Sequence, residues 1–159
     1  LTIEREIGLR FAEAITLQVY AETLIALNEL SLAEKKMQSA LLLRFELNQE
    51  THHLLPPQLG LAHIAHLKNS HSKAQAGLEL IMAELSSQTL DGLGDPFGFY
   101  WLCYSLLDYY DDPRAAQLIE DAHQQLQMQA NNIPDLKSRQ SFLQNVPENR
   151  AIVEKYKQL

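Results

Sequence analysis

Five of the six histidines lie close together in the sequence, between residues 52 and 71. His63 and His66 are three residues apart, which places both imidazoles on one face of a helix. A zinc site needs three or four converging ligands, commonly with cysteine or carboxylate among them. Few acidic residues lie nearby, and the single cysteine, Cys103, is remote in the sequence. We therefore expect ordinary surface or groove histidines, with no bound metal and no cofactor.

The segment from Asp91 to Pro96 combines acidic residues with Gly92 and Gly94. It lacks the alternating acids and the closing glutamate of a calcium loop, so a turn-rich linker is the simpler interpretation. The two glycines are too few for a nucleotide-binding fingerprint, and the sequence contains no phosphate-binding loop. Cys103 falls at a small-residue position of a predicted helix, where we expect an inert, packed thiol. These residues predict no active site, and we expect that the domain is not an enzyme.

The composition limits the kind of partner. The formal net charge is −7, and no run of lysine and arginine offsets it locally. Phosphate binding needs a positive field, which argues against nucleic acid as the main partner. No apolar stretch approaches the ~18–20 uncharged residues of a membrane span, and no signal peptide is visible. We expect a cytoplasmic protein that contacts neither nucleic acid nor membrane.

An internal repeat of 41 residues predicts the elements that position these side chains. Stepping forward by 41 from Ala21 leads to Ala62 and then to Cys103. Five further series keep this interval and are apolar or small throughout. The members near the start of each repeat share one helix face, and those near its end share the face of a second helix. The five series are Tyr20, Leu61 and Leu102; Leu24, Ala65 and Leu106; Ala33, Ala74 and Ala115; Met37, Leu78 and Ile119; and Ala40, Ile81 and Ala122.

Each repeat therefore predicts a helix, a tight turn and an antiparallel helix. Polar or proline-containing segments separate the two helices of a pair. Ser31 and Glu34 match a capping box at the start of a second helix, and Asp112-Pro113 is typical of a cap followed by a first helical proline.

The predicted domain boundaries follow from this pattern. Residues 10–131 are expected to form three helix pairs, and residues 132–159 to form C-terminal capping helices that cover the last pair. Residues 1–9, with Gly8 as a cap, are interpreted as the tail of an upstream helix or the edge of a fragment of a longer protein. The three predicted pairs span residues 10–48, 57–86 and 97–130.

The residues within each pair resemble the tetratricopeptide repeat family. Its pattern has large, small and large residues on the first helix, then an alanine and a bulky residue four positions later on the second. Leu102-Cys103-x-x-Leu106 followed by Ala115-x-x-x-Ile119 fits this pattern best. The resemblance implies an all-α fold in which antiparallel helix hairpins stack into a right-handed superhelix.

The chain departs from that family in two respects. Its usual glycine is replaced by Ala21, Ala62 and Cys103, and the 41-residue period exceeds the usual ~34 and lies in the range of HEAT and armadillo pairs. The nine residues from Leu106 to Ala115 nevertheless favour the short turn of the tetratricopeptide family.

The C-terminal segment from Arg139 to Arg150 resembles the ending common in large bacterial signalling proteins. In those chains such a helical array follows an ATPase module, often with a cyclase, kinase or transcription-activator domain at the other end. The resemblance covers the whole chain and implies a C-terminal sensor or scaffold region of a bacterial regulatory protein.

In an array of this type, the first helices of successive pairs line the concave face. Tyrosine and histidine on such a face are amphipathic contact residues of the kind enriched at binding sites. The alternative is that these aromatic residues pack against the following helix and that the chain's own C-terminus fills the groove. The predicted partner-binding residues are Gln18, Glu22 and Ile25 in the first pair, Leu59, His63 and His66 in the second, and Tyr100, Tyr104, Leu107 and Asp108 in the third.

Three functions are compatible with these features. The leading hypothesis is a protein-interaction and signal-relay module that binds a peptide, a partner protein or a neighbouring domain of its own chain on the concave face. The second is a small-molecule sensor that controls an upstream ATPase or regulator. The third is a structural element that forms a homodimer through an apolar end of the stack.

Overall fold

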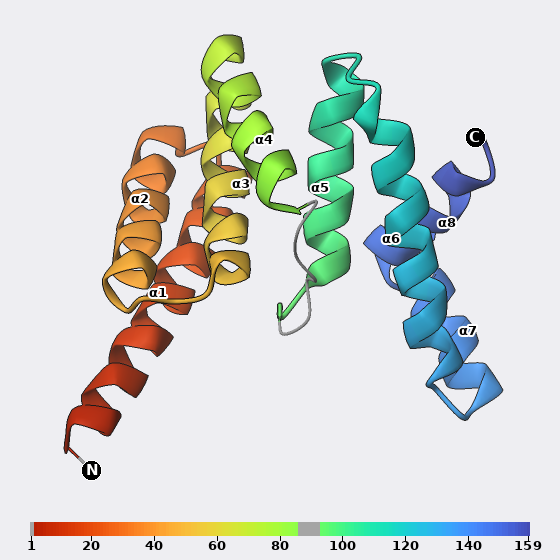
Figure 1. The fold of residues 1–159 in the computed structure, drawn as a ribbon, viewed down its shortest axis with the longest axis horizontal. Coiled ribbons are helices and arrows are strands. Elements are labelled where there is room, and N and C mark those ends of the chain that lie inside the picture. Colours follow the sequence, from red (N-terminus) through yellow and green to blue (C-terminus); the bar gives the residue numbers. More distant parts are fainter. Residues whose placement is uncertain (1, 86–92) are drawn as a thin grey trace. The chain divides into compact units, whose positions relative to one another are not determined.

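The computed structural model describes residues 2–85 and 93–159, and within these ranges the chain forms helices and no strand (Figure 1). The predicted all-α fold is therefore confirmed. The helices are α1 (Thr2–Ala26), α2 (Leu30–Glu46), α3 (Thr51–Leu67), α4 (His71–Leu85), α5 (Pro96–Tyr109), α6 (Arg114–Asn131), α7 (Leu136–Gln144) and α8 (Pro147–Tyr156).

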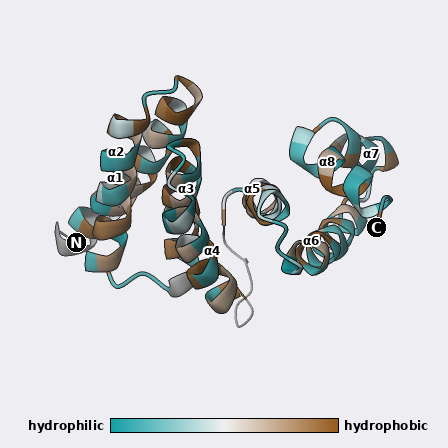
Figure 2. Ribbon diagram, turned by 90° about the horizontal axis from the view of Figure 1, so that it is seen from above, coloured by the Kyte–Doolittle hydropathy of each residue, from teal (hydrophilic) through white to brown (hydrophobic). Residues whose placement is uncertain are grey.

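These helices belong to two compact units, unit 1 (Leu1–Leu93) with α1 to α4 and unit 2 (Gly94–Leu159) with α5 to α8. In unit 1, α1 packs on α2, α2 on α3 and α3 on α4. In unit 2, α5 and α6 form a hairpin, α8 packs on both, and α7 packs on α6 and α8. Figure 2 shows hydrophobic and hydrophilic residues alternating around the helices of each unit, as helices with one buried face require.

The 41-residue interval marks the cores of both units. Five of the six series consist of buried residues only, so the hairpins share one packing pattern. The sixth series does not follow it, since Tyr20 is 46% exposed. The superhelical stacking of the three hairpins remains a prediction. The buried series are those that begin with Ala21, Leu24, Ala33, Met37 and Ala40.

Each hairpin turn contains one residue with a left-handed backbone, at Asn28 (φ 62°), Asn69 (φ 58°) and Asp111 (φ 53°). Asparagine and aspartate tolerate this conformation better than most residues with a side chain. The following amide then bonds a carbonyl of the helix that is ending, as Glu29 N does with Leu24 O at 2.8 Å. The third turn comes one residue later than the 41-residue interval predicts.

The predicted boundary after residue 9 is wrong. α1 runs without interruption through residues 2–9 to Ala26, so these residues are not the tail of a separate helix. Gly8 lies inside α1, where a Cβ would meet nothing within 4 Å. A glycine inside a helix costs only about 1 kcal/mol, which a helix of 25 residues tolerates.

The predicted start of the second pair at residue 57 is also wrong, because α3 begins at Thr51 and contains Pro56 and Pro57. Proline lacks the N–H that would bond the carbonyl four residues earlier. For Pro57 that carbonyl belongs to His53, and the Arg44 guanidinium donates to it instead, at 2.6 Å. A side chain from α2 thus replaces a backbone donor and lets the helix continue across the proline pair.

The capping box predicted at Ser31 and Glu34 is not formed. α2 already begins before Ser31, and no side-chain hydrogen bond caps it. Glu34 instead accepts hydrogen bonds from Lys68 (2.6 Å) and Lys73 (2.7 Å). The bond from Lys68 is the largest cause that holds the pKa of Glu34 below its ordinary value. Glu34 therefore links α2 to the second hairpin.

The two capping helices predicted for residues 132–159 are present as α7 and α8. Asp135 caps α7 by accepting a hydrogen bond from the Ser138 amide, and α8 begins with Pro147 as its first residue. The predicted end of the second pair at residue 86, and Asp91 with Gly92 of the acidic turn, lie outside the described residues.

Candidate binding surfaces

A buried arginine of α2 links the first three helices of unit 1 through hydrogen bonds. Arg44 is 6% exposed and donates to Gln18 Oε1 of α1 (2.7 Å) and to the His53 carbonyl of α3 (2.6 Å). Gln18 in turn donates to Glu22 Oε1 at 2.9 Å. Burial lowers the pKa of the Arg44 guanidinium, and the charge of Glu22 acts in the opposite direction. The network is structural, because its central side chain is closed off from solvent.

Several residues that were predicted to line a concave binding face belong instead to the Arg44 network or to the buried core. Leu59 is only 2% exposed, so its prediction as a contact residue is wrong. The physical reason is that α3 packs on α1, α2 and α4, which leaves few of its positions outside. Ile25 is half-buried against the cluster around Met37, and Gln18 is engaged with Arg44. Among Gln18, Glu22, Ile25 and Leu59, only Glu22 is exposed.

His63 and His66 are half-buried on α3. Burial lowers the pKa of His63, and the nearby His66 lowers it further. The His66 ring meets the His71 ring edge-on, with centroids 6.1 Å apart. Within residues 2–85 and 93–159, no three histidine, cysteine, aspartate or glutamate side chains gather in a group that could hold a metal ion.

In unit 2, the chain's own C-terminal helix covers the face of α5. Tyr104 is 4% exposed, its ring lies 5.4 Å from that of Trp101, and the Lys155 ammonium of α8 lies 5.6 Å from its centroid. α7 also reaches α5, where the Phe97 and Phe142 rings meet edge-on at 6.1 Å. In unit 2 the chain's own C-terminal helices therefore cover this face of α5, whereas the filling of a concave groove by the C-terminus stays a prediction.

Two of the four α5 residues predicted to bind a partner are core residues. Tyr104 is covered as described, and Leu107 has no exposed surface, so both predictions are wrong. α6 and α8 both pack on α5 and bury more of its circumference than a simple hairpin would. Tyr100 is half-buried with its ring 6.4 Å from that of Phe99, and Asp108 is exposed.

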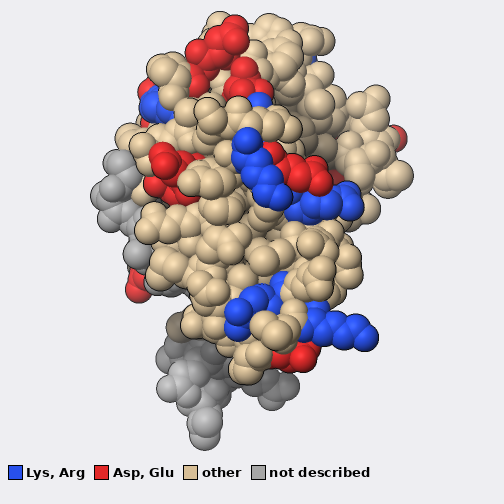
Figure 3. Space-filling view, turned by 90° about the vertical axis from the view of Figure 1, so that its right-hand side faces the viewer, with Lys and Arg blue, Asp and Glu red and all other residues tan. Residues whose placement is uncertain are grey.

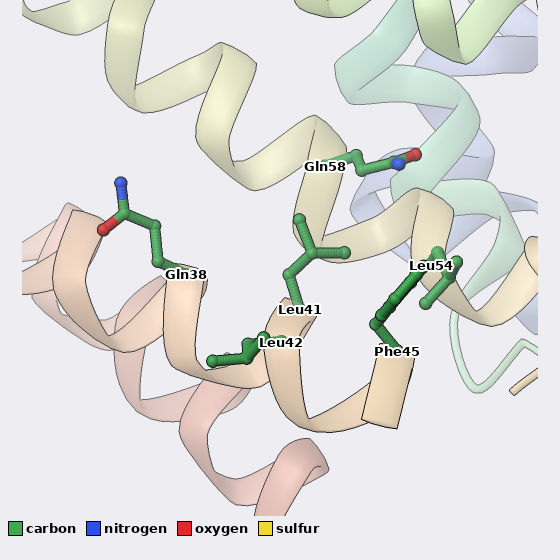
Figure 4. A pocket seen from close by; sticks show the side chains of 6 residues that line it. All are labelled: Gln38, Leu41, Leu42, Phe45, Leu54 and Gln58. Atoms are coloured by element: carbon green, nitrogen blue, oxygen red, sulfur yellow. The ribbon is translucent and has the colours of Figure 1, made fainter. Parts of the chain in front are cut away.

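An open concave site of unit 1 lies elsewhere, between α2 and α3 (Figure 4). It has a volume of about 370 Å³. Leu42 and Phe45 are 59% and 70% exposed, and in Figure 4 the Phe45 ring and Leu54 project toward the same space. Gln58 also lines the groove, and its buried Oε1 has no hydrogen-bond partner within the described part of the chain. We call this site the α2–α3 groove; its lining residues are Gln38, Leu41, Leu42, Phe45, Leu54 and Gln58.

The α2–α3 groove was not predicted from the sequence, because the predicted binding residues all lie on the first helix of a pair. A signal was present in residues 41–45, where four of five residues are large and apolar. A helix packed on one side cannot bury every position of such a run. Leu43 is buried and Leu42 and Phe45 remain outside, as this argument requires.

One face of the molecule carries mixed charge. On the face shown in Figure 3, acidic and basic side chains lie interspersed, and uncharged residues cover the larger part.

Cys103 is buried as predicted, and burial raises the pKa of its thiol to about 12, so the thiolate is absent at neutral pH. None of the helices in the described part of the chain has the length and hydropathy that crossing a membrane requires.

Comparison with known proteins adds no assignment to this geometry. No family model, curated protein or solved structure matches the chain. The helices themselves establish the all-α fold.

Proposed function

We propose that the chain is a protein-interaction module whose unit 1 binds an amphipathic helix of a partner protein in the α2–α3 groove. The main support is that Leu42 and Phe45 remain 59% and 70% exposed beside a concave site of about 370 Å³. Exposed apolar side chains gathered at a concave site are typical of interaction surfaces. The binding face predicted on the first helix of each pair is less suitable, because its residues Leu59, Tyr104 and Leu107 are buried.

The shape and chemistry of the groove favour a helix as the occupant. α2 and α3 form its two walls, and a third helix packs readily into the channel between two helices. The lining is apolar apart from Gln38 and Gln58, and it contains no charged side chain. The partner helix is therefore expected to present apolar anchors along one face, with a neutral hydrogen-bond donor that Gln58 can meet after a change of rotamer.

A selection experiment tests this proposal. A phage-displayed library of 20-residue amphipathic helical peptides is selected against the full chain, and the affinities of enriched peptides are measured by fluorescence anisotropy. Phe45→Asp is expected to weaken binding at least about 10-fold, because it places a charge in an apolar contact. The substitution is expected to leave the fold intact, since Phe45 is 70% exposed.

The matched control is Leu80→Asp on α4, where an equally apolar and 66% exposed residue lies outside the groove. It is expected to leave peptide affinity unchanged. The proposal is refuted if no peptide is enriched, or if Phe45→Asp and Leu80→Asp behave alike.

A small apolar ligand is the second candidate. The groove volume of about 370 Å³ lies within the ~300–1,000 Å³ range of small-molecule sites. Such sites normally bury most of the ligand surface, whereas the α2–α3 groove leaves Leu42 and Phe45 largely open. A thermal-shift screen with apolar metabolites separates the two candidates, because a native-state ligand raises the melting temperature.

The relay of occupancy to an upstream bacterial signalling domain is a further part of the proposal, and it rests on the sequence resemblance alone. The Arg44 network could carry it, since Arg44 of α2 is hydrogen-bonded to α1 and to α3, and α2 and α3 form the walls of the groove.

A further inference from the structure

A proline pair interrupts the backbone hydrogen bonds of α3 after its first turn, residues 51–55. Pro56 and Pro57 have no N–H to donate to the carbonyls of His52 and His53, four residues earlier. Arg44 of α2 donates to the His53 carbonyl at 2.6 Å and replaces one of the two missing bonds. The first turn of α3 is therefore held partly by a side chain of another helix.

The His53 side chain lies in surroundings that disfavour a positive charge. Its ring meets the Phe11 ring of α1 edge-on at 6.2 Å, and its centroid lies 4.0 Å from that of His52. Burial lowers the pKa of His53, and the nearby His52 and Arg44 lower it further. A proton on His53 places a second positive charge beside an arginine that is only 6% exposed.

Few acidic groups offset such a charge. Glu50, at the N-cap of α3, acts on the pKa of His53 in the opposite direction, but its side chain is 82% exposed and already lies 3.3 Å from His52 Nδ1. Solvent screens an exposed carboxylate, so its effect is small. Further charged groups on the neighbouring helices are Glu22 of α1, which acts on Arg44; Arg10 of α1 and Glu46 of α2, which pair at 2.5 Å; and the exposed Glu84 of α4.

The first turn of α3 also forms part of the α2–α3 groove. Leu54 belongs to this turn, and Figure 4 shows it projecting toward the same space as the Phe45 ring of α2. Gln58, on the other side of the proline pair, lines the groove as well. The groove is therefore complete only while the first turn stays packed on α2. Its lining residues contain no titratable side chain, so a pH dependence of binding has to originate outside the lining.

We propose that protonation of His53 releases the first turn of α3 from α2 and thereby opens one wall of the α2–α3 groove. The groove then holds its partner helix at neutral pH and loses it at mildly acidic pH. The regulated site is the groove of the proposed function, and the proposal rests on that function.

The direction of the pH effect follows from the two states of the turn. In the released turn, His53 has its ordinary pKa of 6.5, whereas in the packed turn its pKa is lower. The packed turn therefore binds the proton less readily than the released one. Its stability is complete above pH 6.5 and is lost as the pH falls through the lowered pKa.

A peptide selected against the groove, without histidine, aspartate or glutamate, tests the proposal by fluorescence anisotropy. Its affinity is expected to fall at least about 3-fold from about pH 7.5 to about pH 5.5, because only molecules with a packed first turn bind it. His53→Gln removes the titrating group and keeps the backbone carbonyl that Arg44 binds. This variant is expected to bind the peptide equally well at both pH values.

His66→Gln is the matched control, because His66 lies on the same helix beyond the proline pair and its ring meets that of His71 instead. It is expected to keep the pH dependence of the wild type. The proposal is overturned if His53→Gln retains the pH dependence, or if His66→Gln abolishes it.

A second measurement needs no peptide. The ¹³Cα chemical shifts of residues 52–55 are expected to be helical at about pH 7.5 and to move toward random-coil values at about pH 5.5, while residues 59–66 remain helical. Unchanged shifts at residues 52–55 overturn the proposal.

The two measurements also separate this proposal from the proposed function. If a peptide binds equally well at both pH values, the pH switch is refuted and the groove remains a binding site. If no peptide is enriched, the proposed function fails, and the chemical shifts alone decide whether the first turn is released.

Discussion

The two units use the same buried hairpin pattern but cover it differently. In unit 2, α8 packs on α5 and α6, and Lys155 lies over the Tyr104 ring. In unit 1, no helix of the described residues fills the α2–α3 groove, and Phe45 is 70% exposed. The residues shared by the repeats therefore build the fold, and residues outside the repeat series determine whether a unit is closed or available for binding.

Removal of α8 is expected to have the largest effect and to unfold the closed unit. Deleting residues 147–159 removes Ile152, which has no exposed surface, and Tyr156, whose ring stacks on that of His123 at 3.8 Å. Unit 2 is expected to lose at least about 5 kcal/mol of unfolding free energy. Trp101, the single tryptophan, reports this in urea denaturation.

Loss of the Trp101 unfolding transition is expected while the helical signal of unit 1 persists. An unchanged denaturation midpoint would show that α8 does not hold unit 2 together.

Arg44→Met is expected to destabilise unit 1 by about 2–3 kcal/mol and leave unit 2 unaffected. The substitution leaves the partly buried His53 carbonyl and Gln18 amide oxygen without their donor, and this loss of stability exceeds the gain from removing a buried charge. Hydrogen exchange of α3 amides measures the effect, and Trp101 fluorescence serves as the control in unit 2. Arg44→Lys is expected to fall between wild type and Arg44→Met, because a lysine ammonium lacks the guanidinium fork.

Glu34→Gln is expected to cost about 1 kcal/mol at neutral pH, since the pairs with Lys68 and Lys73 are partly exposed. The pKa of Glu34 is lowered in the folded state from an ordinary value of 4.5. Its contribution is therefore complete above about pH 4.5 and is lost as the pH falls through the lowered pKa. Chemical denaturation from pH 7 to 3 is expected to show the two proteins converging at low pH.

Replacing the left-handed turn residues with glycine is expected to have the smallest effect, and it compares one hairpin turn of each unit. Asn69→Gly in unit 1 and Asp111→Gly in unit 2 are each expected to stabilise the protein by about 0.5–1 kcal/mol, because glycine adopts a positive φ without a Cβ clash. Melting curves measure both. A stabilisation of one unit only would show that the turns are not equivalent.

The helix hairpins could be predicted from the sequence because their core residues recur every 41 residues. Ala33, Ala74 and Ala115 are at most 6% exposed, because each lies near the start of the second helix of its hairpin. The tight turns were predictable for the same reason, although Asp111 comes one residue late. The two C-terminal helices were also predicted, and in the structure α7 begins after its Asp135 cap and α8 begins with Pro147.

Features that depend on distant residues could not be predicted. The start of α3 before two prolines depends on Arg44, which satisfies the His53 carbonyl from another helix. The burial of Tyr104 depends on Lys155, 51 positions away in sequence. Local propensity carries no information about either partner, and so the predicted binding face included residues that belong to the core.

Amide chemical-shift mapping with a groove-selected peptide tests most directly whether partner binding belongs to unit 1. The largest shifts are expected for residues 38–58, which contain the α2–α3 groove, with amides of α5 and α8 unchanged. Shifts concentrated on α5, or release of α8 from Tyr104, would contradict the division into an open and a closed unit.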